Sequence, residues 1–503
     1  MIGILVAVVL SSMHYEGDVG AAGGDYQSVD VVVPEGTVEI EIAHTDGSDV
    51  TILDWGAWGP DGFRGWGGGL TDPAIIGTAQ SSRCYLPGAI PAGTWTIEIG
   101  KAKLDPVGGH YAIDVTCRDT ATLPVLPQAS YAAPVLEQTR RWYKGDLHVH
   151  SVQSGDATAT FEQIITLARS RGLDFANISD HNTVAQHALL AAIQPDHPDL
   201  LLLRGAEITT YSGHGNAVGI HAYVDHRLGL NGRTVTNILD DVAAQGGIFI
   251  VNHPVLDLGT ACIGCMWQHV DDTPWDKVTG LEILTGNYSL GILAFFPRAI
   301  ALWDMELAAG HRLAAIGGSD DHNAGMNMTS TGSPIGSPTT LVLADNLSEA
   351  AIIDALKHGR TIVDLQGPDA PGLDFTLANG SATAEIGDEV DGLGHYAFTV
   401  HVTGGTGTTV ELWRDGASVA QRDVTSDDFT TVFDRSPGPA LERWRVHLDR
   451  DGQPIVVTSH IYTIGGPAAT DGCGCQSTSG VSGMLLVSLG AGALLLGRRR
   501  RAT

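Results

Sequence analysis

Two histidines one residue apart, His148 and His150, stand in the segment KGDLHVHS near the first third of the chain. The short run before them alternates as in a β-strand, and residues i and i+2 of a strand point to the same side. Two imidazoles on one side of a strand can bind a single metal ion. The same pair also fits a solvent-exposed strand surface, so the octapeptide alone leaves both interpretations open.

Further residues of metal-ligating type follow other expected strands in the same part of the chain. A histidine, aspartate or glutamate stands at or just after the C-terminal end of each of six strands. Beyond His148 and His150, the candidate ligands are Asp156, His181, Glu207, His214, His253, Asp320 and His322. The C-terminal strand ends of a βα barrel share one face, where active sites lie. If the pattern were random, it would require six independent coincidences.

The mixture of imidazoles and carboxylates indicates which metals would bind. Neutral imidazoles with carboxylates suit Zn²⁺, Mn²⁺ or Fe²⁺, whereas an oxygen-only set would indicate Ca²⁺ or Mg²⁺. Glu207 could bridge two ions. Two or three close cations lower the pKa of a bound water and stabilise an anionic transition state. The sequence therefore predicts a hydrolase in which a hydroxide bridging two ions attacks an ester.

Three of these assignments have alternatives. Asp156 could instead cap the helix that follows it, and His221 could take the place of His214. Asp320 is preferred to Asp321, because an Asp-x-His spacing again puts two ligands on one side of an extended segment.

Asp180, directly before His181, is the candidate catalytic residue that does not itself bind metal. It is expected to orient a neighbouring ligand or water, and either Asp180 or a metal-bound water could protonate the leaving group. The histidines outside these motifs are interpreted as surface or packing residues; among them are His187, His197, His226, His269 and His311.

The motifs HVHS with SGD, SDHN, GAEITT with GHGNAVGI, NHP and GGSDDH follow one another between about residues 142 and 366. This ordered set resembles the PHP (polymerase and histidinol phosphatase) metallohydrolases, most closely the CehA/McbA-like subgroup named for carbaryl hydrolases. The resemblance implies a distorted (β/α)7 barrel that holds two or three metals. It implies three sites, formed by His148, His150, Glu207 and Asp320, by Glu207, His214 and His253, and by Asp156, His181 and His322.

The elements that must position these residues have a clear order along the chain. Helical periods alternate with short apolar strands over residues 142–366, which predicts a parallel sheet or barrel. Short alternating runs broken by turn residues predict one β-sandwich over 26–120 and a second over 370–464. A Pro- and Ala-rich linker is expected at 121–141. The predicted fold class is α/β, a barrel flanked by N- and C-terminal β-sandwiches.

Both ends of the chain carry export-like features. Residues 1–25 are a candidate export signal with a short apolar run, although the basic n-region is missing. Residues 465–503 contain a Cys-Gly motif, a polar spacer, about 15 apolar residues and four arginines. This end fits a plain membrane anchor, and it also resembles the MYXO-CTERM sorting tails of myxobacterial surface proteins, with Cys473 or Cys475 as the attachment point. Either interpretation predicts an exported protein held at the cell surface or outer membrane through its C-terminal region.

The composition limits the class of partner. The chain of 503 residues has a formal net charge of −29, from 57 Asp+Glu against 28 Lys+Arg. This excess argues against nucleic acid as a partner. Among the six cysteines, Cys84 and Cys117 are expected to form a disulfide. Cys262 and Cys265 are expected to form a short local disulfide or to remain thiols rather than to bind a structural zinc.

The expected substrate is a small-molecule ester. The motif loops carry no basic cluster for a terminal phosphate dianion, since Arg204 lies within a strand and Arg298 in the 255–300 insert. This favours a phosphodiester, or a neutral ester, over a phosphomonoester. Two alternatives stay open: hydrolysis of a carbamate or another non-phosphorus ester, and a surface binding protein with an inactive barrel. The sequence indicates no oligomeric state.

Overall fold

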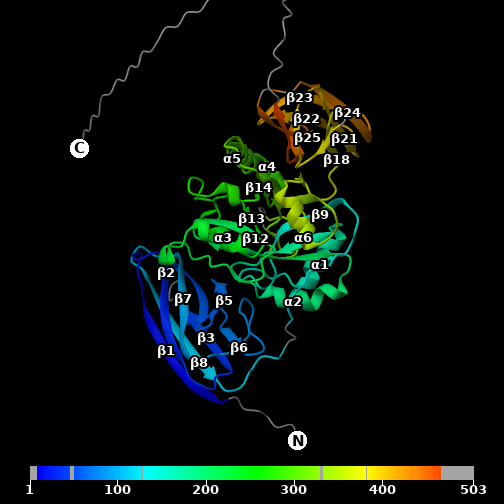
Figure 1. Ribbon diagram of the computed structural model, residues 1–503. Coiled ribbons are helices and arrows are strands. Elements are labelled where there is room, and N and C mark those ends of the chain that lie inside the picture. Colours follow the sequence, from blue (N-terminus) through cyan, green and yellow to red (C-terminus); the bar gives the residue numbers. More distant parts are fainter. Residues whose placement is uncertain are drawn as a thin grey trace, which may run out of the picture. The chain divides into compact units, whose positions relative to one another are not determined.

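The computed structural model describes residues 8–45, 50–125, 129–328, 332–380, 382–392, 394–436, 438 and 440–465. Along these residues the chain forms an N-terminal β-domain, a central α/β region and a C-terminal β-region (Figure 1). The candidate sorting tail beyond residue 465 lies outside the described residues. Within the described ranges, no helix is long and apolar enough to cross a membrane.

The N-terminal β-domain consists of two four-stranded antiparallel sheets, with the strand orders β1-β8-β3-β6 and β2-β7-β4-β5. Its strands are β1 (Val9–Val19), β2 (Tyr26–Val33), β3 (Glu39–Thr45), β4 (Ile52–Gly59), β5 (Gly62–Gly68), β6 (Ala74–Gly77), β7 (Gly93–Lys103) and β8 (Gly109–Arg118). Alternate side chains of both sheets, among them Trp55, Trp95 and Ile113, are buried in one core.

Strand β1 lies within the stretch that the sequence assigned to a candidate export signal. It pairs with β8 along its length, from Val9 opposite Arg118 to Val19 opposite Gly109. Exposed and half-buried side chains alternate along β1, as a strand on the outside of the domain requires. The folded domain therefore begins near residue 9 and not at residue 26, which corrects the predicted boundary.

The two cysteines of this domain do not form the predicted disulfide. Cys84 and Cys117 are both buried and both free. Cys117 lies in β8, whereas Cys84 lies in the loop between β6 and β7, whose backbone contacts the central region. The Cys84 N–H donates to Gln153 Oε1 (2.8 Å), and the Cys84 carbonyl accepts from Thr183 Oγ1 (3.0 Å). Cys84 is therefore positioned by a contact between domains and not by a covalent bond to β8.

The central region combines short strands with six helices. Its strands are β9 (Arg141–Val149), β10 (Phe175–Ile178), β11 (Leu201–Thr210), β12 (Gly213–Val218), β13 (Ile248–Val251), β14 (Gly280–Thr285), β15 (Ala314–Gly318), β16 (Thr339–Ala344) and β17 (Thr361–Asp364). Its helices are α1 (Phe161–Ser170), α2 (Gln186–Ile193), α3 (Val235–Ala244), α4 (Tyr288–Ala294), α5 (Phe296–Ala308) and α6 (Glu349–Lys357).

Strands β9 to β15 are neighbours in chain order within one sheet. The strands β9, β10 and β11 are parallel, and so are β13, β14 and β15. Strand β12 is antiparallel to both of its neighbours, because a tight turn joins it directly to β11 without a helix. A parallel bridge between Val149 and Asp321 connects the segment after β15 back to β9. The βα alternation expected from the sequence is thus interrupted at β12.

Helix α1 begins with a capping box next to the candidate site. The Thr160 side chain accepts from the Gln163 N–H (3.3 Å), and the Gln163 side chain accepts from the Thr160 N–H (2.9 Å). Ile164 and Ile165 bury the inner face of the helix. Because Thr160 is the N-cap, the interpretation of Asp156 as a helix cap is wrong.

The C-terminal β-region shares a sheet with the central region. Its strands are β18 (Gly372–Asn379), β19 (Ala382–Glu385), β20 (Glu389–Gly392), β21 (Tyr396–Thr403), β22 (Thr409–Arg414), β23 (Ala417–Asp423), β24 (Asp428–Arg435), β25 (Leu441–Arg450), β26 (Gln453–Thr458) and β27 (Ile461–Gly465). Strand β17 pairs with β26, with Ile362 opposite Thr458. The boundary predicted between residues 366 and 370 therefore does not interrupt the sheet, because β26 covers the open edge of β17.

Candidate metal centre

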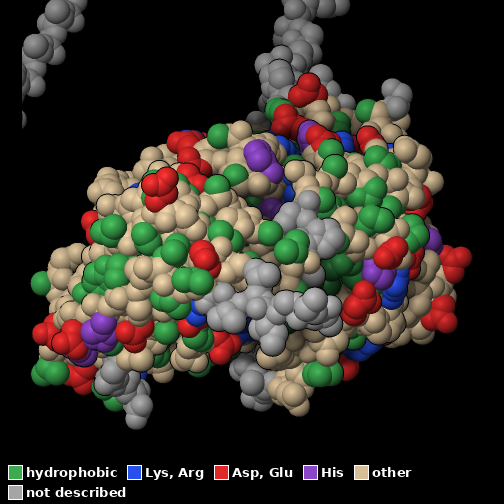
Figure 2. All heavy atoms as spheres, turned by 90° about the horizontal axis from the view of Figure 1, so that it is seen from below, with side chains coloured by type: hydrophobic (Ala, Val, Ile, Leu, Met, Phe, Trp, Pro, Cys, Tyr) green, Lys and Arg blue, Asp and Glu red, His purple; other side chains and the backbone are tan. Residues whose placement is uncertain are grey.

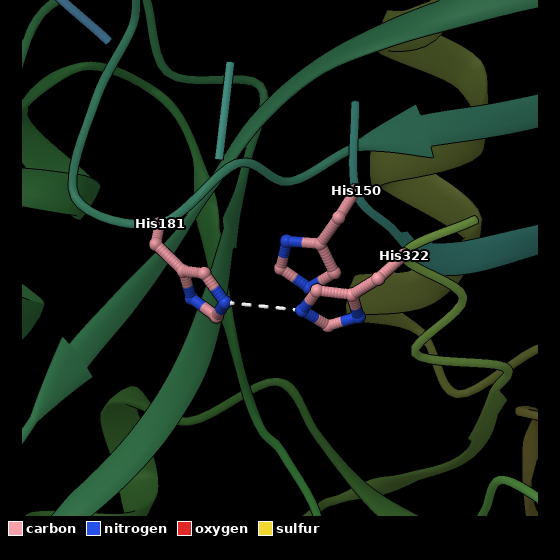
Figure 3. A group of neighbouring side chains, drawn as sticks. All are labelled: His150, His181 and His322. Carbon is pink, nitrogen blue, oxygen red and sulfur yellow. Dashed lines mark hydrogen bonds between the residues drawn. The ribbon is translucent and has the colours of Figure 1, made fainter. Parts of the chain in front are cut away.

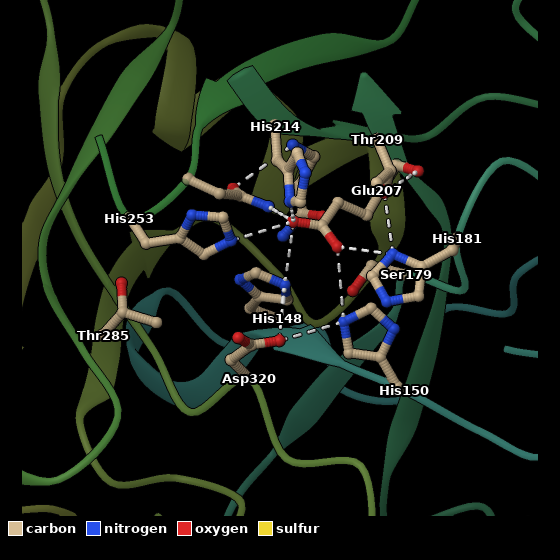
Figure 4. Close-up of polar contacts among 12 residues, drawn as sticks. His148, His150, Ser179, His181, Glu207, Thr209, His214, His253, Thr285 and Asp320 are labelled. Atoms are coloured by element: carbon tan, nitrogen blue, oxygen red, sulfur yellow. Dashed lines mark hydrogen bonds and ion pairs between the residues drawn. The ribbon is translucent and has the colours of Figure 1, made fainter. Parts of the chain in front are cut away.

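The structure brings the nine predicted ligands together in the central region. Figure 4 shows seven of these side chains: His148, His150, His181, Glu207, His214, His253 and Asp320. Among the described residues, three overlapping groups of side chains each have ligand atoms within 4.8 Å of one another: His148, His150 and Asp320; His148, Glu207 and His253; and His150, His181 and His322. His214 and Asp156 lie at the edges of these groups, each within 3.5 Å of one of their members.

Glu207, in the buried part of β11, is the centre of the arrangement. Its two carboxylate oxygens face different imidazoles. Oε1 lies 3.2 Å from His253 Nε2, 3.4 Å from His148 Nε2 and 3.5 Å from His214 Nδ1, and Oε2 lies 2.8 Å from His181 Nδ1 and 3.6 Å from His150 Nε2. A carboxylate that offers one oxygen to each of two imidazole groups has the geometry of a bridging ligand.

Asp320 closes the same group from the segment after β15. Its Oδ1 lies 3.1 Å from His148 Nε2 and 3.2 Å from His150 Nε2. The backbone of Asp320 has a φ of 56°, a conformation that L-residues rarely adopt and that is often found at functional sites. Its neighbour Asp321 instead accepts backbone N–H groups from Asn323 (2.8 Å) and Gly325 (2.7 Å). Asp321 therefore holds the loop, and Asp320 faces the centre.

The third group lies around His150, His181 and His322, whose rings face one another in Figure 3. The Nε2 atoms of His181 and His322 are 3.3 Å apart, and Asp156 Oδ2 lies 3.5 Å from each of them. His221, the alternative to His214, is exposed, and its backbone N–H donates to the Gln245 side chain. His214, and not His221, therefore belongs to the centre.

The donor set fits bound divalent cations. His148 Nε2, His150 Nε2 and Glu207 Oε2 are buried and make no hydrogen bond in the described structure. They lie instead next to ligand atoms of the opposite kind, with His148 Nε2 and His150 Nε2 at 3.1 and 3.2 Å from Asp320 Oδ1, so a shared cation would satisfy them together. Imidazoles mixed with carboxylates are the ligands of transition metals such as zinc, manganese and iron.

The distal nitrogens of the ligands are held by a second set of residues. His148 Nδ1 is 2.9 Å from Glu282 Oε1, and His150 Nδ1 is 3.0 Å from Ser154 Oγ. Glu282 also accepts the His253 N–H at 2.7 Å. Such contacts fix the tautomer and the orientation of a ligating imidazole. Glu282 was missed in the sequence, although a lone glutamate inside the apolar strand GLEILT is a signal of a buried charge that needs a partner.

Asp180 is one of these supporting residues. Its carboxylate accepts from the Ser151 N–H and Oγ (2.7 Å each) and from Ser154 Oγ (2.9 Å). Ser154 in turn contacts His150. Asp180 is fully buried and does not line the cavity described below. This geometry matches the predicted orienting role and gives Asp180 no route to a leaving group.

The CIGC segment forms a short local disulfide between Cys262 and Cys265, one of the two states expected for it. The two sulfurs and His214 Nδ1 or Nε2 also lie within 4.8 Å of one another, and the disulfide takes both thiols out of this group. The loop instead contacts two ligands through its backbone. His214 Nε2 lies 3.1 Å from the Ile263 carbonyl, and His253 Nδ1 lies 3.1 Å from the Cys265 carbonyl.

A cavity of about 550 Å³ opens onto the centre. Its floor includes Asp156, His181, Glu207 and Asp320, and its walls are largely apolar. None of the described residues that line it is a lysine or arginine. Arg204, one of the two arginines considered in the sequence, is paired with Glu349 instead. The described lining therefore offers no cationic side chain to a substrate.

In the centre, the buried imidazoles and carboxylates shift one another's pKa values. Burial lowers the pKa of His181 and His322, but Asp156 next to both raises it, to well above the ordinary value for His181 and to about 9 for His322. Burial raises the pKa of Glu207, but His148 and His181 hold it well below its usual range. Without cations, protonated imidazoles must therefore balance the buried carboxylates.

Metal binding is accordingly expected to release protons and to strengthen as pH rises. Ligating imidazoles must be neutral, and the raised pKa values mean that protons compete for them up to about pH 9 at His322. Between pH 6 and 8 the apparent affinity should rise with pH, with at least one proton released per chain. Titration calorimetry in buffers of different ionisation enthalpy measures that number. An affinity independent of pH over this range would contradict the assignment of these histidines.

Replacing Glu282 with glutamine is expected to weaken metal binding by about 10- to 100-fold, the usual effect of losing an outer-shell partner. The charge that raises the pKa of His148 and orients its ring would be lost, while the volume is kept. Glu162→Gln, at a largely exposed position of α1, is the matched control. Competition with a fluorescent chelator measures the affinity. Equal affinities of the two variants would show that Glu282 does not support the centre.

Comparisons with known proteins find similarity among solved structures alone. No protein-family model and no curated protein matches the chain. A two-domain protein from Bacteroides vulgatus ATCC 8482, which contains a predicted PHP-like metal-dependent phosphoesterase, is 19% identical, with a TM-score of 0.35 over 67% of this chain and 100% of that one. A proposed metal-dependent phosphoesterase from Bifidobacterium adolescentis ATCC 15703 is 18% identical, with a TM-score of 0.28 over 40% of this chain and 91% of that one. At this level, neither similarity bears on the individual residues of the centre.

Proposed function

We propose that this protein is a metal-dependent hydrolase of small-molecule esters, and that its substrate is a phosphoester. The observation that carries the proposal is the convergence of buried imidazole and carboxylate atoms around Glu207 at the base of an open cavity. Two or three divalent transition metals (Zn, Mn or Fe) held there would supply Lewis acidity and lower the pKa of water.

The chain's own residues have distinct tasks in this proposal. Glu207 joins the two groups of ligands, and Asp320, Asp156 and the histidines complete them. Glu282 and the Asp180–Ser154 pair keep the imidazole rings in place. The largely apolar cavity walls would pack against the apolar part of a bound ester.

The lining of the cavity supports a choice among esters. A phosphomonoester dianion is usually bound by arginine or lysine, and no such side chain is among the described lining residues. A phosphodiester carries one charge less, so we favour the diester. The same apolar lining supports a second candidate, hydrolysis of a carbamate or another neutral ester.

The remaining features of the proposal come from the sequence. We propose a distorted (β/α)7 barrel of the PHP type, CehA/McbA-like, flanked by two β-sandwiches, in an exported protein attached to the cell surface or outer membrane through its C-terminal tail. Acidic side chains are spread over the face in Figure 2, and the described residues there form no continuous basic patch. This surface supports the expectation that nucleic acid is not a partner.

The test is hydrolysis by metal-loaded protein of a panel containing aryl phosphomonoesters, aryl phosphodiesters and an aryl carbamate. The double variant His148→Ala, His150→Ala is expected to lose activity on every substrate that the wild type cleaves. His221→Ala, an exposed histidine outside the centre, is the matched control and should keep it. Unchanged hydrolysis by the double variant would refute the proposed ligands. A wild type that binds metal and cleaves nothing would favour a binding protein with an inactive centre.

A further inference from the structure

The N-terminal β-domain contacts the loops that carry the third group of ligands. Arg83 donates to the carbonyls of Gly155 (2.9 Å) and Ala157 (3.2 Å), on either side of Asp156. A Cβ atom added to Gly155 would lie 2.4 Å from the Gly67 carbonyl, so the backbone of β5 touches this loop directly. The β-domain therefore borders the metal centre.

The same domain provides one wall of the cavity. Ile52, Trp66 and Leu70 line it from β4, from β5 and from the loop after β5. Leu256, Leu258 and Ile263 line it from the loop that follows His253. The space between these two walls is apolar, and it opens onto the ligand side chains of the floor.

Asp54, in β4, is the acidic residue that the β-domain places on this cavity. One of its oxygens, Oδ2, accepts a hydrogen bond from the Tyr211 hydroxyl (2.7 Å). The other oxygen makes no hydrogen bond to the described residues. Burial raises the pKa of Asp54 to about 6, although the Tyr211 bond and the nearby His181 lower it. Asp54 belongs to none of the groups of ligand atoms within 4.8 Å.

We propose that the N-terminal β-domain forms the binding site for the alcohol part of the ester, and that this site selects an apolar, aromatic-sized alcohol bearing an amine or hydroxyl group that donates to Asp54. A carboxylate oxygen on a largely apolar cavity is favourable when a donor or cation of the bound molecule meets it. The proposal rests on the proposed function in one respect, since it assigns this wall to the leaving group.

The test is binding of two product-like phenols to metal-loaded protein, measured by calorimetry. The probes are 4-(aminomethyl)phenol and 4-ethylphenol, which are similar in size but differ in carrying an ammonium or a methyl group. The wild type is expected to bind the aminomethyl probe at least about tenfold more tightly, since hydrogen bonds to charged groups are the stronger ones. Asp54→Asn, which can still accept from Tyr211, is expected to abolish this preference.

Two controls separate charge from structure. Tyr211→Phe removes the hydroxyl but keeps the carboxylate, and it should retain the preference, as should Asp30→Asn at an exposed position of the same domain. Leu70→Asn is expected to weaken the binding of both probes about equally. Equal binding of the two probes by the wild type, or an undiminished preference in Asp54→Asn, would overturn the proposal. A preference that depends on Asp54 in a protein that hydrolyses no ester would support this site and refute the hydrolase function.

Discussion

Glu207→Gln is expected to lower kcat/KM by more than about 100-fold, beyond the 10- to 100-fold effect of losing an outer-shell partner. Glu207 lies within 3.6 Å of five histidines, and its two oxygens face different groups of ligands. Glutamine keeps the shape but offers one amide oxygen and no charge. In the variant, the two groups of ligands should therefore no longer share a carboxylate, and both should bind cations less tightly.

The measurement combines steady-state kinetics on the best substrate of the ester panel with metal content per chain. Glu35→Gln, an exposed glutamate of the N-terminal β-domain, is the control and should match the wild type. Circular dichroism confirms that the variant is folded. If Glu207→Gln keeps more than a tenth of the activity with a full complement of metal, the central role of Glu207 is wrong.

Arg445→Ala is expected to lower the free energy of unfolding by about 3–5 kcal/mol, the usual cost of removing one partner of a buried ion pair. Arg445, in β25, is fully buried and pairs with Asp304 of α5, with one Nη2–Oδ2 distance of 3.0 Å. Its guanidinium also lies 5.1 Å from the ring centroids of Trp303 and Trp413. The substitution would leave Asp304 without its partner and open a cavity between α5 and the C-terminal β-region.

Urea unfolding followed by tryptophan fluorescence measures this loss. Arg422→Ala, an exposed arginine of β23, is expected to change stability by less than about 0.5 kcal/mol. A change for Arg445→Ala as small as that of Arg422→Ala would show that this ion pair does not stabilise the contact between α5 and β25.

Local sequence patterns explain which elements could be predicted. Alternation of period two in the segments around Trp55 and Trp95 corresponds to buried strands, and the Thr160 capping box begins α1 where the helical period starts. The antiparallel strand β12 was missed because the glycine-rich segment GHGNAV does not have the pattern of a strand, although a tight turn directly after β11 favours an antiparallel partner. Strand β1 was left out of the predicted N-terminal sandwich, because its apolar start outweighed the weaker alternation after it.

The candidate ligands could be proposed from the sequence because they stand in short motifs at or near the ends of the expected strands, whereas their supports lie elsewhere in the sequence. Glu282 is inside a strand and Asp54 is in another domain, so no spacing rule connects them with His148. The disulfide between Cys84 and Cys117 was predicted from the even number of cysteines, and that number says nothing about where the two side chains point. Contacts between distant segments are thus the part that only the structure provided.

The most direct test of the central claim is the metal content of protein purified without chelators, measured by inductively coupled plasma mass spectrometry. Three overlapping groups of ligands around Glu207 predict at least two transition-metal ions per chain, and the His148→Ala, His150→Ala double variant should hold fewer. Less than one transition-metal ion per chain in the wild type would contradict the metal centre and the hydrolytic function built on it.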